Sequence, residues 1–127
     1  MNLTIHLISF FFGLDVCFKH TAGLDQNRYV IPASIISGND IEFLALVDAE
    51  NGLWTPDRKH PTNSNGSNDW GFCGINDYWH KDTVNHPNFF NPIWQLNKCH
   101  ELYIGGTKFY GKSRTHITRN HFTCLEW

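Results

Sequence analysis

An apolar run with helical periodicity lies near the middle of the chain, over residues 41–50. Asn39 or Asp40 precedes it, and either side chain can accept the free amide hydrogens of a first helical turn. Gly52 follows the run and is typical of a helix end. The pattern therefore predicts a buried helix that begins after Asp40 and ends close to Glu50.

A second helix is predicted from both of its ends. Asn91-Pro92 supplies a suitable N-cap residue followed by proline in the first helical position. Leu96, Cys99 and Tyr103 then recur at helical spacing, before Gly105-Gly106 stops the helix.

The segment between the two helices is polar and rich in turn-forming residues. Asn65-Gly66 is a strong signal for a tight turn, and the short segments that flank it suit a β-hairpin. One strand is expected over Trp70-Gly71-Phe72, with Gly71 there to let the backbone approach a ligand closely. The chain is therefore predicted to be α+β, mostly helical with one small antiparallel hairpin.

The length of 127 residues leaves room for one domain, and 41% apolar residues suffice for a core. Residues 1–37 have a weak period and form a leader or a packed helical element. Residues 38–111 hold both predicted helices and the hairpin, and residues 112–127 form a tail without clear periodicity.

A formal net charge of -2 argues against a nucleic-acid partner, because no basic stripe is present to neutralise phosphates. The eight histidines match no Cys-x-x-Cys or His-Glu-x-x-His pattern, so no metal or cofactor is expected. The four cysteines allow three pairings. Cys73 and Cys99 could join the hairpin to the second helix, or both could be buried free thiols.

The N-terminal segment is apolar, but three features argue against a cleaved signal peptide. No Lys or Arg precedes the apolar run, Asp15 closes it early, and no small-x-small cleavage site follows. The run is also shorter than the roughly 20 residues that a transmembrane helix needs. The sequence favours a packed N-terminal element, without a membrane span.

Glu50 ends an apolar face of the first predicted helix. Phe43, Leu46 and Val47 precede it by seven, four and three residues, so all three share its face. Partial desolvation disfavours the charged carboxylate and raises its pKa, which a general acid near neutral pH requires. The alternative is an ordinary helix-end glutamate that reaches water. Spacing alone leaves both interpretations open.

The hairpin region carries the clearest motif. The run from Asn65 to Trp79 resembles the hairpin of animal-type lysozymes, which reads Gly-Ser-x-Asp-aromatic-Gly-x-x-Gln-Ile-Asn followed by aromatic residues. Glu50-Asn51-Gly52 is similar to the Glu-Ser-x opening of bacterial lytic transglycosylase domains. Thr107-Lys108-Phe109-Tyr110-Gly111 is similar to the ending of some bacterial members. The matching hairpin positions are Gly66, Ser67, Asp69, Trp70, Gly71, Ile75, Asn76 and Trp79.

This resemblance implies a lysozyme-like fold with the hairpin beside an active-site cleft. It also implies cleavage of the β-1,4 bond between N-acetylmuramic acid and N-acetylglucosamine in peptidoglycan. Glu50 would protonate the leaving oxygen, and Asp69 would stabilise the oxocarbenium-like transition state or act as nucleophile. A monomer acting on peptidoglycan strands, in an extracellular, periplasmic or phage-associated setting, is expected. The expected substrate-binding residues are Trp70, Ile75, Asn76, Tyr78, Trp79 and Tyr110.

Two departures from the resemblance leave other functions open. Gly74 stands where both families usually carry Gln, and the disulfide set of animal lysozymes is absent. Both departures weaken the resemblance to animal lysozymes more than the resemblance to lytic transglycosylases, in which Glu50 would act alone as acid and then base. A non-catalytic glycan-binding or virion structural module on the same fold is a third possibility. A cysteine peptidase or amidase that uses Cys73 with His80 or His100 is a fourth.

Overall fold

The computed structural model describes residues 17–20, 24–109 and 121–123. This part of the chain is α+β and mostly helical, as the sequence predicted. Its helices are α2 (Leu24–Ser37), α3 (Ile41–Glu50), α4 (Lys81–Val84) and α5 (Pro92–Ile104). Its strands are β1 (Phe18–Lys19), β2 (Asp69–Trp70), β3 (Ile75–Asn76) and β4 (Phe122–Thr123). Strand β1 pairs with β4 and β2 with β3, both antiparallel.

Helix α3 lies at the centre of the core. It begins where the sequence predicted, because Asp40 Oδ1 accepts a hydrogen bond from Phe43 N (3.2 Å). It ends at Glu50, and Asn51 N donates to Val47 O (2.8 Å) beyond the last helical residue. All residues from Phe43 to Asp48 are buried. The helix is therefore enclosed on every side, instead of burying a single apolar stripe.

Helix α2 lies in the segment 1–37, for which the sequence left a leader or a packed helical element open and predicted no helix bounds. It contains Pro32, which lacks an amide hydrogen and usually ends a helix, so the local pattern argues against it. Val30 and Ala33 are nevertheless fully buried in the same core as Phe43. The helix ends at Gly38-Asn39, where both residues have positive φ (64° and 62°) and the chain turns into α3.

Helix α5 has the predicted ends. Asn91 Oδ1 accepts from the backbone N–H groups of Ile93 and Trp94, both at 3.1 Å. On its buried face, Cys99 forms a disulfide with Cys73, so the hairpin is covalently joined to α5. Cys17 is also disulfide-bonded. Because Cys73 carries no free thiol, it cannot be the nucleophile of a peptidase or amidase.

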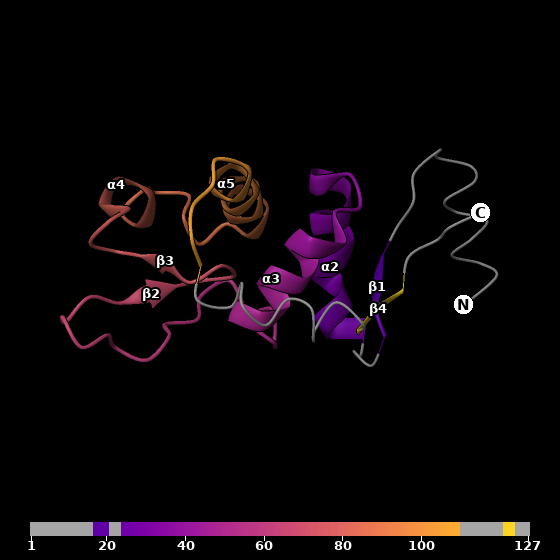
Figure 1. Cartoon of the computed structure of the whole chain (residues 1–127), viewed down its shortest axis with the longest axis horizontal. Coiled ribbons are helices and arrows are strands. Elements are labelled where there is room, and N and C mark those ends of the chain that lie inside the picture. Colours follow the sequence, from indigo (N-terminus) through magenta and orange to yellow (C-terminus); the bar gives the residue numbers. More distant parts are fainter. Residues whose placement is uncertain (1–16, 21–23, 110–120, 124–127) are drawn as a thin grey trace.

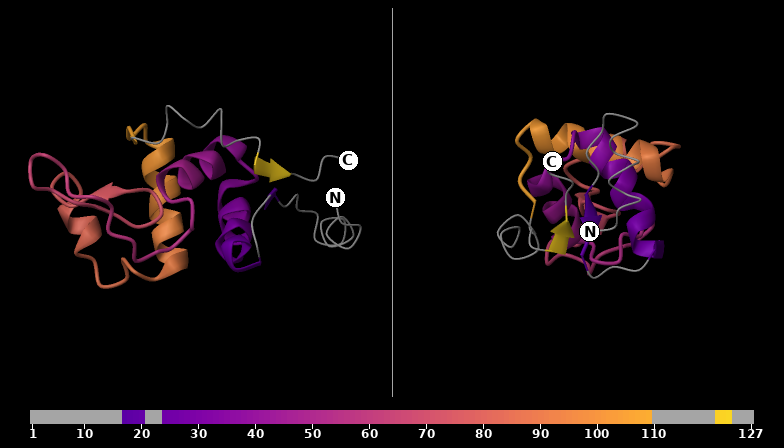
Figure 2. Two further views of the ribbon diagram at one scale, coloured as in Figure 1. Left: turned by 90° about the horizontal axis from the view of Figure 1, so that it is seen from below. Right: turned by 90° about the vertical axis from the view of Figure 1, so that its right-hand side faces the viewer.

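The elements follow one another along the longest axis of the molecule. The β2–β3 hairpin and α4 lie at one end, the β1–β4 pair lies at the other, and α3 lies between them (Figure 1). The view from below shows the same order (Figure 2). Within the part of the chain that the structure describes, no helix has the length and apolar character needed to cross a membrane.

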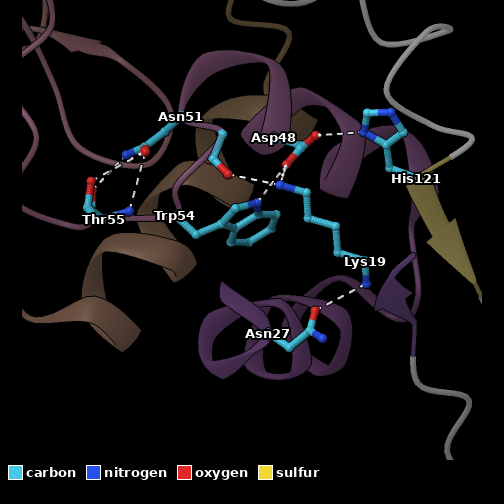
Figure 3. A network of polar contacts seen from close by, with 8 residues as sticks. Lys19, Asn27, Asp48, Asn51, Trp54, Thr55 and His121 are labelled. Carbon is cyan, nitrogen blue, oxygen red and sulfur yellow. Dashed lines mark hydrogen bonds and ion pairs between the residues drawn. The ribbon is translucent and has the colours of Figure 1, made fainter. Parts of the chain in front are cut away.

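A buried ion pair connects the β1–β4 end to α3 (Figure 3). Asp48 Oδ1 lies 2.8 Å from Lys19 Nζ, and it also accepts a hydrogen bond from Trp54 Nε1 (3.0 Å). Lys19 Nζ donates as well to Gly52 O (2.9 Å), just past the end of α3. His121 Nδ1, next to β4, lies 3.6 Å from Asp48 Oδ2. The C-terminal turn of α3 is thus held from both ends of the described chain.

Candidate active site

The hairpin has a shorter ladder and a wider turn than the sequence suggested. Asp69 pairs with Asn76 and Trp70 with Ile75, and residues 71–74 form the turn between the strands. Of the strand expected over residues 70–72, only Trp70 lies in β2, and Gly71 and Phe72 belong to the turn. An extended segment at residues 58–60 lies antiparallel to β2 and contacts it through an isolated bridge between Lys59 and Trp70. The Asn65-Gly66 turn lies in the loop between this segment and β2.

Gly71 is required for a reason other than ligand approach. Its φ is +78°, and a Cβ atom there would overlap the side-chain amide of Gln95. Gln95 is fully buried, and its Oε1 accepts from Phe72 N (2.6 Å). Its Nε2 donates to Pro56 O (2.8 Å) and Phe89 O (2.9 Å). The space beside Gly71 is therefore filled by α5, which corrects the expectation of a ligand contact.

Gly74 is where the side chains of the candidate site meet. Its φ is +62°, and a Cβ atom there would lie 2.8 Å from Glu50 Oε2 and 3.7 Å from Asp69 Cβ. It would also lie 3.5 Å from His60 Cε1. Glu50 Oε2 and Asp69 Cβ are thus no more than about 6.5 Å apart, and the two carboxyl groups fall within the ~9.5 Å upper limit for paired glycosidase carboxyls.

Asp69 is held by a polar network within the hairpin. Its Oδ1 accepts from Asn76 Nδ2 (2.8 Å), and the same nitrogen donates to Ser67 Oγ (2.9 Å). Asn76 Oδ1 accepts from the backbone N–H groups of Tyr78 (2.9 Å) and Trp79 (3.1 Å). Asn76 therefore fixes both the orientation of the Asp69 carboxyl and the start of the aromatic segment.

A pocket of about 500 Å³ opens beside this cluster. Asp69, Gly74 and Asn76 form part of one wall, and Trp79 borders it. Most of the other lining side chains carry amide or hydroxyl groups, which suits a ligand rich in hydroxyls. The lining residues are Asn63, Ser64, Asn65, Ser67, Asp69, Gly74, Ile75, Asn76, Trp79, His80, Thr107, Lys108 and Phe109.

Some predicted substrate-binding residues lie elsewhere. Trp70 packs edge-on against Phe90, with ring centroids 6.1 Å apart, because alternate strand residues face opposite sides and Asp69 takes the pocket side. Ile75 borders the pocket, but its side chain is buried in the core. Tyr78 is exposed and borders a second, shallower hollow together with Trp79. Tyr110 lies outside the described residues.

Two site residues escaped the sequence reasoning. Asn51 is fully buried, and its Nδ2 donates to Gly71 O (3.1 Å) and Thr55 O (2.7 Å), which fastens the end of α3 to the hairpin turn. His60 also contacts that carbonyl, with its Nε2 2.9 Å from Gly71 O. Neither residue stands in a motif, and their contacts with the hairpin span 20 and 11 residues of sequence.

Comparisons with known proteins add no family assignment. No protein-family model, no curated protein and no solved structure matches this chain. Across the described residues, no group of three or more His, Cys, Asp or Glu side chains is arranged to hold a metal ion. Any functional assignment therefore depends on the geometry of the pocket and on the side chains around Gly74.

Proposed function

We propose that this protein is a peptidoglycan-cleaving glycosidase with Glu50 as its general acid. The observation that carries the proposal is the approach of Glu50 and Asp69 to one point at Gly74. Asp69 and Gly74 line a pocket of about 500 Å³, whose lining residues do not include Glu50. A pair of neighbouring carboxyl groups is the usual catalytic equipment for hydrolysis of a glycosidic bond.

The surroundings of the two carboxyl groups support different roles for them. Glu50 is partly buried at the end of a helix whose preceding residues Phe43, Leu46 and Val47 are fully buried. Glu50 therefore ends an apolar helix face, which is the position that we propose for the general acid. Asp69 instead accepts a hydrogen bond from Asn76 Nδ2 (2.8 Å), which orients its carboxyl, and we assign it the role of stabilising an oxocarbenium-like transition state.

The wider pocket suits a glycan. Trp79 borders the pocket and is 73% exposed, so its ring is available to stack on a sugar face. Thr107, Lys108 and Phe109 line the pocket as well, and Lys108 adds a cation for the carboxylates of peptidoglycan. The Cys73–Cys99 disulfide is in keeping with the proposed site of action outside the cytoplasm.

Lytic transglycosylation is the second candidate, and the burial of Asp69 favours it. Only 8% of Asp69 is exposed, and its carboxyl is already engaged by Asn76. If Asp69 serves only to hold the hairpin, Glu50 would act alone as acid and then base. The product would then carry an anhydro-muramyl end in place of a reducing end.

The test is the variant Glu50→Gln, which preserves size and removes the proton donor. Lysis of purified cell walls should fall by roughly 100-fold or more, as is typical for loss of a general acid. Glu101→Gln is the matched control, because Glu101 is an exposed residue of α5. It should lyse cell walls at the parent rate.

Mass spectrometry of the released muropeptides distinguishes the two reactions. Reducing ends indicate hydrolysis, and anhydro-muramyl ends indicate transglycosylation. An active parent whose Glu50→Gln variant retains lysis within about tenfold would refute the assignment of Glu50. A folded parent that releases neither product would refute the enzymatic proposal as a whole.

A further inference from the structure

His60 belongs to a row of polar side chains that crosses the hairpin. Residues 58–60 run antiparallel to β2, with His60 N donating to Asp69 O (2.9 Å) and Gly71 N donating to Arg58 O (2.7 Å). Side chains opposite one another on antiparallel neighbours share a face. His60 therefore lies on the same side as Asp69, which is paired in turn with Asn76.

The hydrogen bond to Gly71 fixes the tautomer of His60. A carbonyl oxygen only accepts hydrogen bonds, so Nε2, 2.9 Å from Gly71 O, must carry a proton. In the neutral ring, the lone pair is then on Nδ1. The Cε1 edge between the two nitrogens faces the space beside Gly74, where a Cβ atom would meet both His60 and Glu50.

The electrostatic setting keeps the ring neutral at neutral pH. Burial lowers the pKa of His60 below its usual value, and the Gly71 carbonyl partly opposes this effect. Arg58, on the same extended segment, lowers this pKa further, whereas the Asp69 carboxylate on β2 raises it. Glu50, from the end of α3, also borders the space beside Gly74.

We propose that His60 is a positioning residue whose charge state controls the candidate active site. In its neutral form it holds the hairpin turn through Gly71 O. Once protonated, it adds a positive charge to the space that it shares with Glu50 and Asp69. This inference rests on the proposed glycosidase function, because the charge matters through the reaction.

A cation at this position opposes the reaction in two ways. The transition state of glycoside cleavage develops positive charge on the sugar, which a nearby imidazolium repels. The same charge stabilises the ionised form of Glu50, although the general acid must be protonated. The Coulomb energy between two unit charges about 6 Å apart, at an effective dielectric constant of ~20, corresponds to a rate change of roughly 100-fold if it acts fully on the transition state. Because His60 is only partly buried, we expect an effect of about tenfold.

The experiment compares pH–activity profiles of the parent and His60→Gln. Glutamine can still donate to Gly71 O, but it does not titrate. Activity at pH near 7.5 should stay within about threefold of the parent. As the pH falls through the pKa of His60, which burial places below its usual value, the parent should lose up to roughly tenfold of its activity, whereas the variant should retain most of its own. A merely structural role would lower activity equally at every pH, and superimposable profiles would overturn the proposal.

His86→Gln is the matched control, because His86 is exposed and stacks on Trp94, with ring centroids 4.4 Å apart. Its profile should match that of the parent. If His86→Gln changes the loss of activity at low pH as much as His60→Gln does, the effect is not specific to the candidate site, and the proposal fails.

An NMR titration of the His60 ring tests its electrostatic coupling to the carboxyl groups of the candidate site without an activity assay. In the parent, the midpoint should lie below the usual value for histidine, because burial lowers the pKa of His60. It should fall by roughly half a pH unit or more in Asp69→Asn, since this change removes a negative charge near the ring. An unchanged midpoint in that variant would overturn the proposed coupling. An inactive parent with a coupled His60 would instead refute the glycosidase function and leave the electrostatic arrangement standing.

Discussion

Gly74 has a larger effect on the candidate site than its size suggests. The resemblance to lysozymes places glutamine at this position, but the turn here has a φ of +62°, a conformation that glycine adopts without strain. The absence of a side chain leaves room for Glu50 Oε2, which a Cβ atom would approach to 2.8 Å. The departure from the family motif is thus compatible with a catalytic Glu50, because it creates space beside the carboxyl.

The variant Gly74→Ala tests this interpretation. Positive φ alone should lower the free energy of unfolding by about 1–2 kcal/mol. The added methyl group should also displace Glu50 and reduce cell-wall lysis by roughly tenfold or more. Urea denaturation and a lysis assay measure the two effects.

Gly38→Ala is the control, because Gly38 has nearly the same φ (64°) and nothing within 4 Å of the added atom. It should lose similar stability and retain full activity. An equal loss of activity in both variants would mean that Gly74 acts through stability alone.

At the scale of elements, the sequence predicted those helix ends that are determined by residues close by in the sequence. The limits of α3 and α5 follow from Asp40 and Asn91, whose side chains cap the first turn within three residues. The bounds of α2 could not be predicted because Pro32 and a weak period obscure them, and burial in the core stabilises the helix. The hairpin strand was misplaced because the fit of Gly71 against Gln95 depends on a partner 24 residues away, which no local pattern reveals.

Gln95 predicts how strongly the hairpin depends on α5. Gln95→Leu would leave Phe72 N, Pro56 O and Phe89 O without their side-chain partner. Buried polar groups without a hydrogen bond are costly, so the free energy of unfolding should fall by about 2–4 kcal/mol in urea denaturation.

Asn97→Leu is the matched control, because Asn97 is exposed on the same helix and bonds only to Ile93 O within it. It should change stability by no more than about 0.5 kcal/mol. If the two variants cost the same, the hydrogen bonds of Gln95 do not hold the hairpin turn.

At the scale of the whole molecule, distant segments complete the candidate site. The sequence singled out Glu50 and Asp69, and the fold brings both to Gly74 because α3 ends against the hairpin turn. It missed Asn51 and His60, since their common contact with Gly71 O exists only after the hairpin docks. The Asp48 network adds a longer connection, from β1 to the turn of α3 that carries Glu50 (Figure 3).

Lys19→Met tests whether this network anchors α3. The Lys19 and Asp48 side chains are only 10% and 4% exposed, so removal of the lysine leaves a buried carboxylate without the cation that lies 2.8 Å from it. The free energy of unfolding should fall by about 3–5 kcal/mol. Lys98→Met is the control, because Lys98 forms a more exposed ion pair with Glu101, in which the two side chains are 26% and 67% exposed. Loss of this pair should lower the free energy of unfolding by less than about 1 kcal/mol.

The double variant Lys19→Met/Asp48→Asn separates charge from packing. Asparagine can still accept the hydrogen bond from Trp54 Nε1, and no buried charge remains without a partner. The double variant should therefore be more stable than Lys19→Met alone, as measured by urea denaturation. If it is less stable, the penalty comes from lost packing of the lysine side chain and not from an unpaired carboxylate. In that case the network would hold α3 through shape, and the Asp48–Lys19 charge pair would not be its anchor.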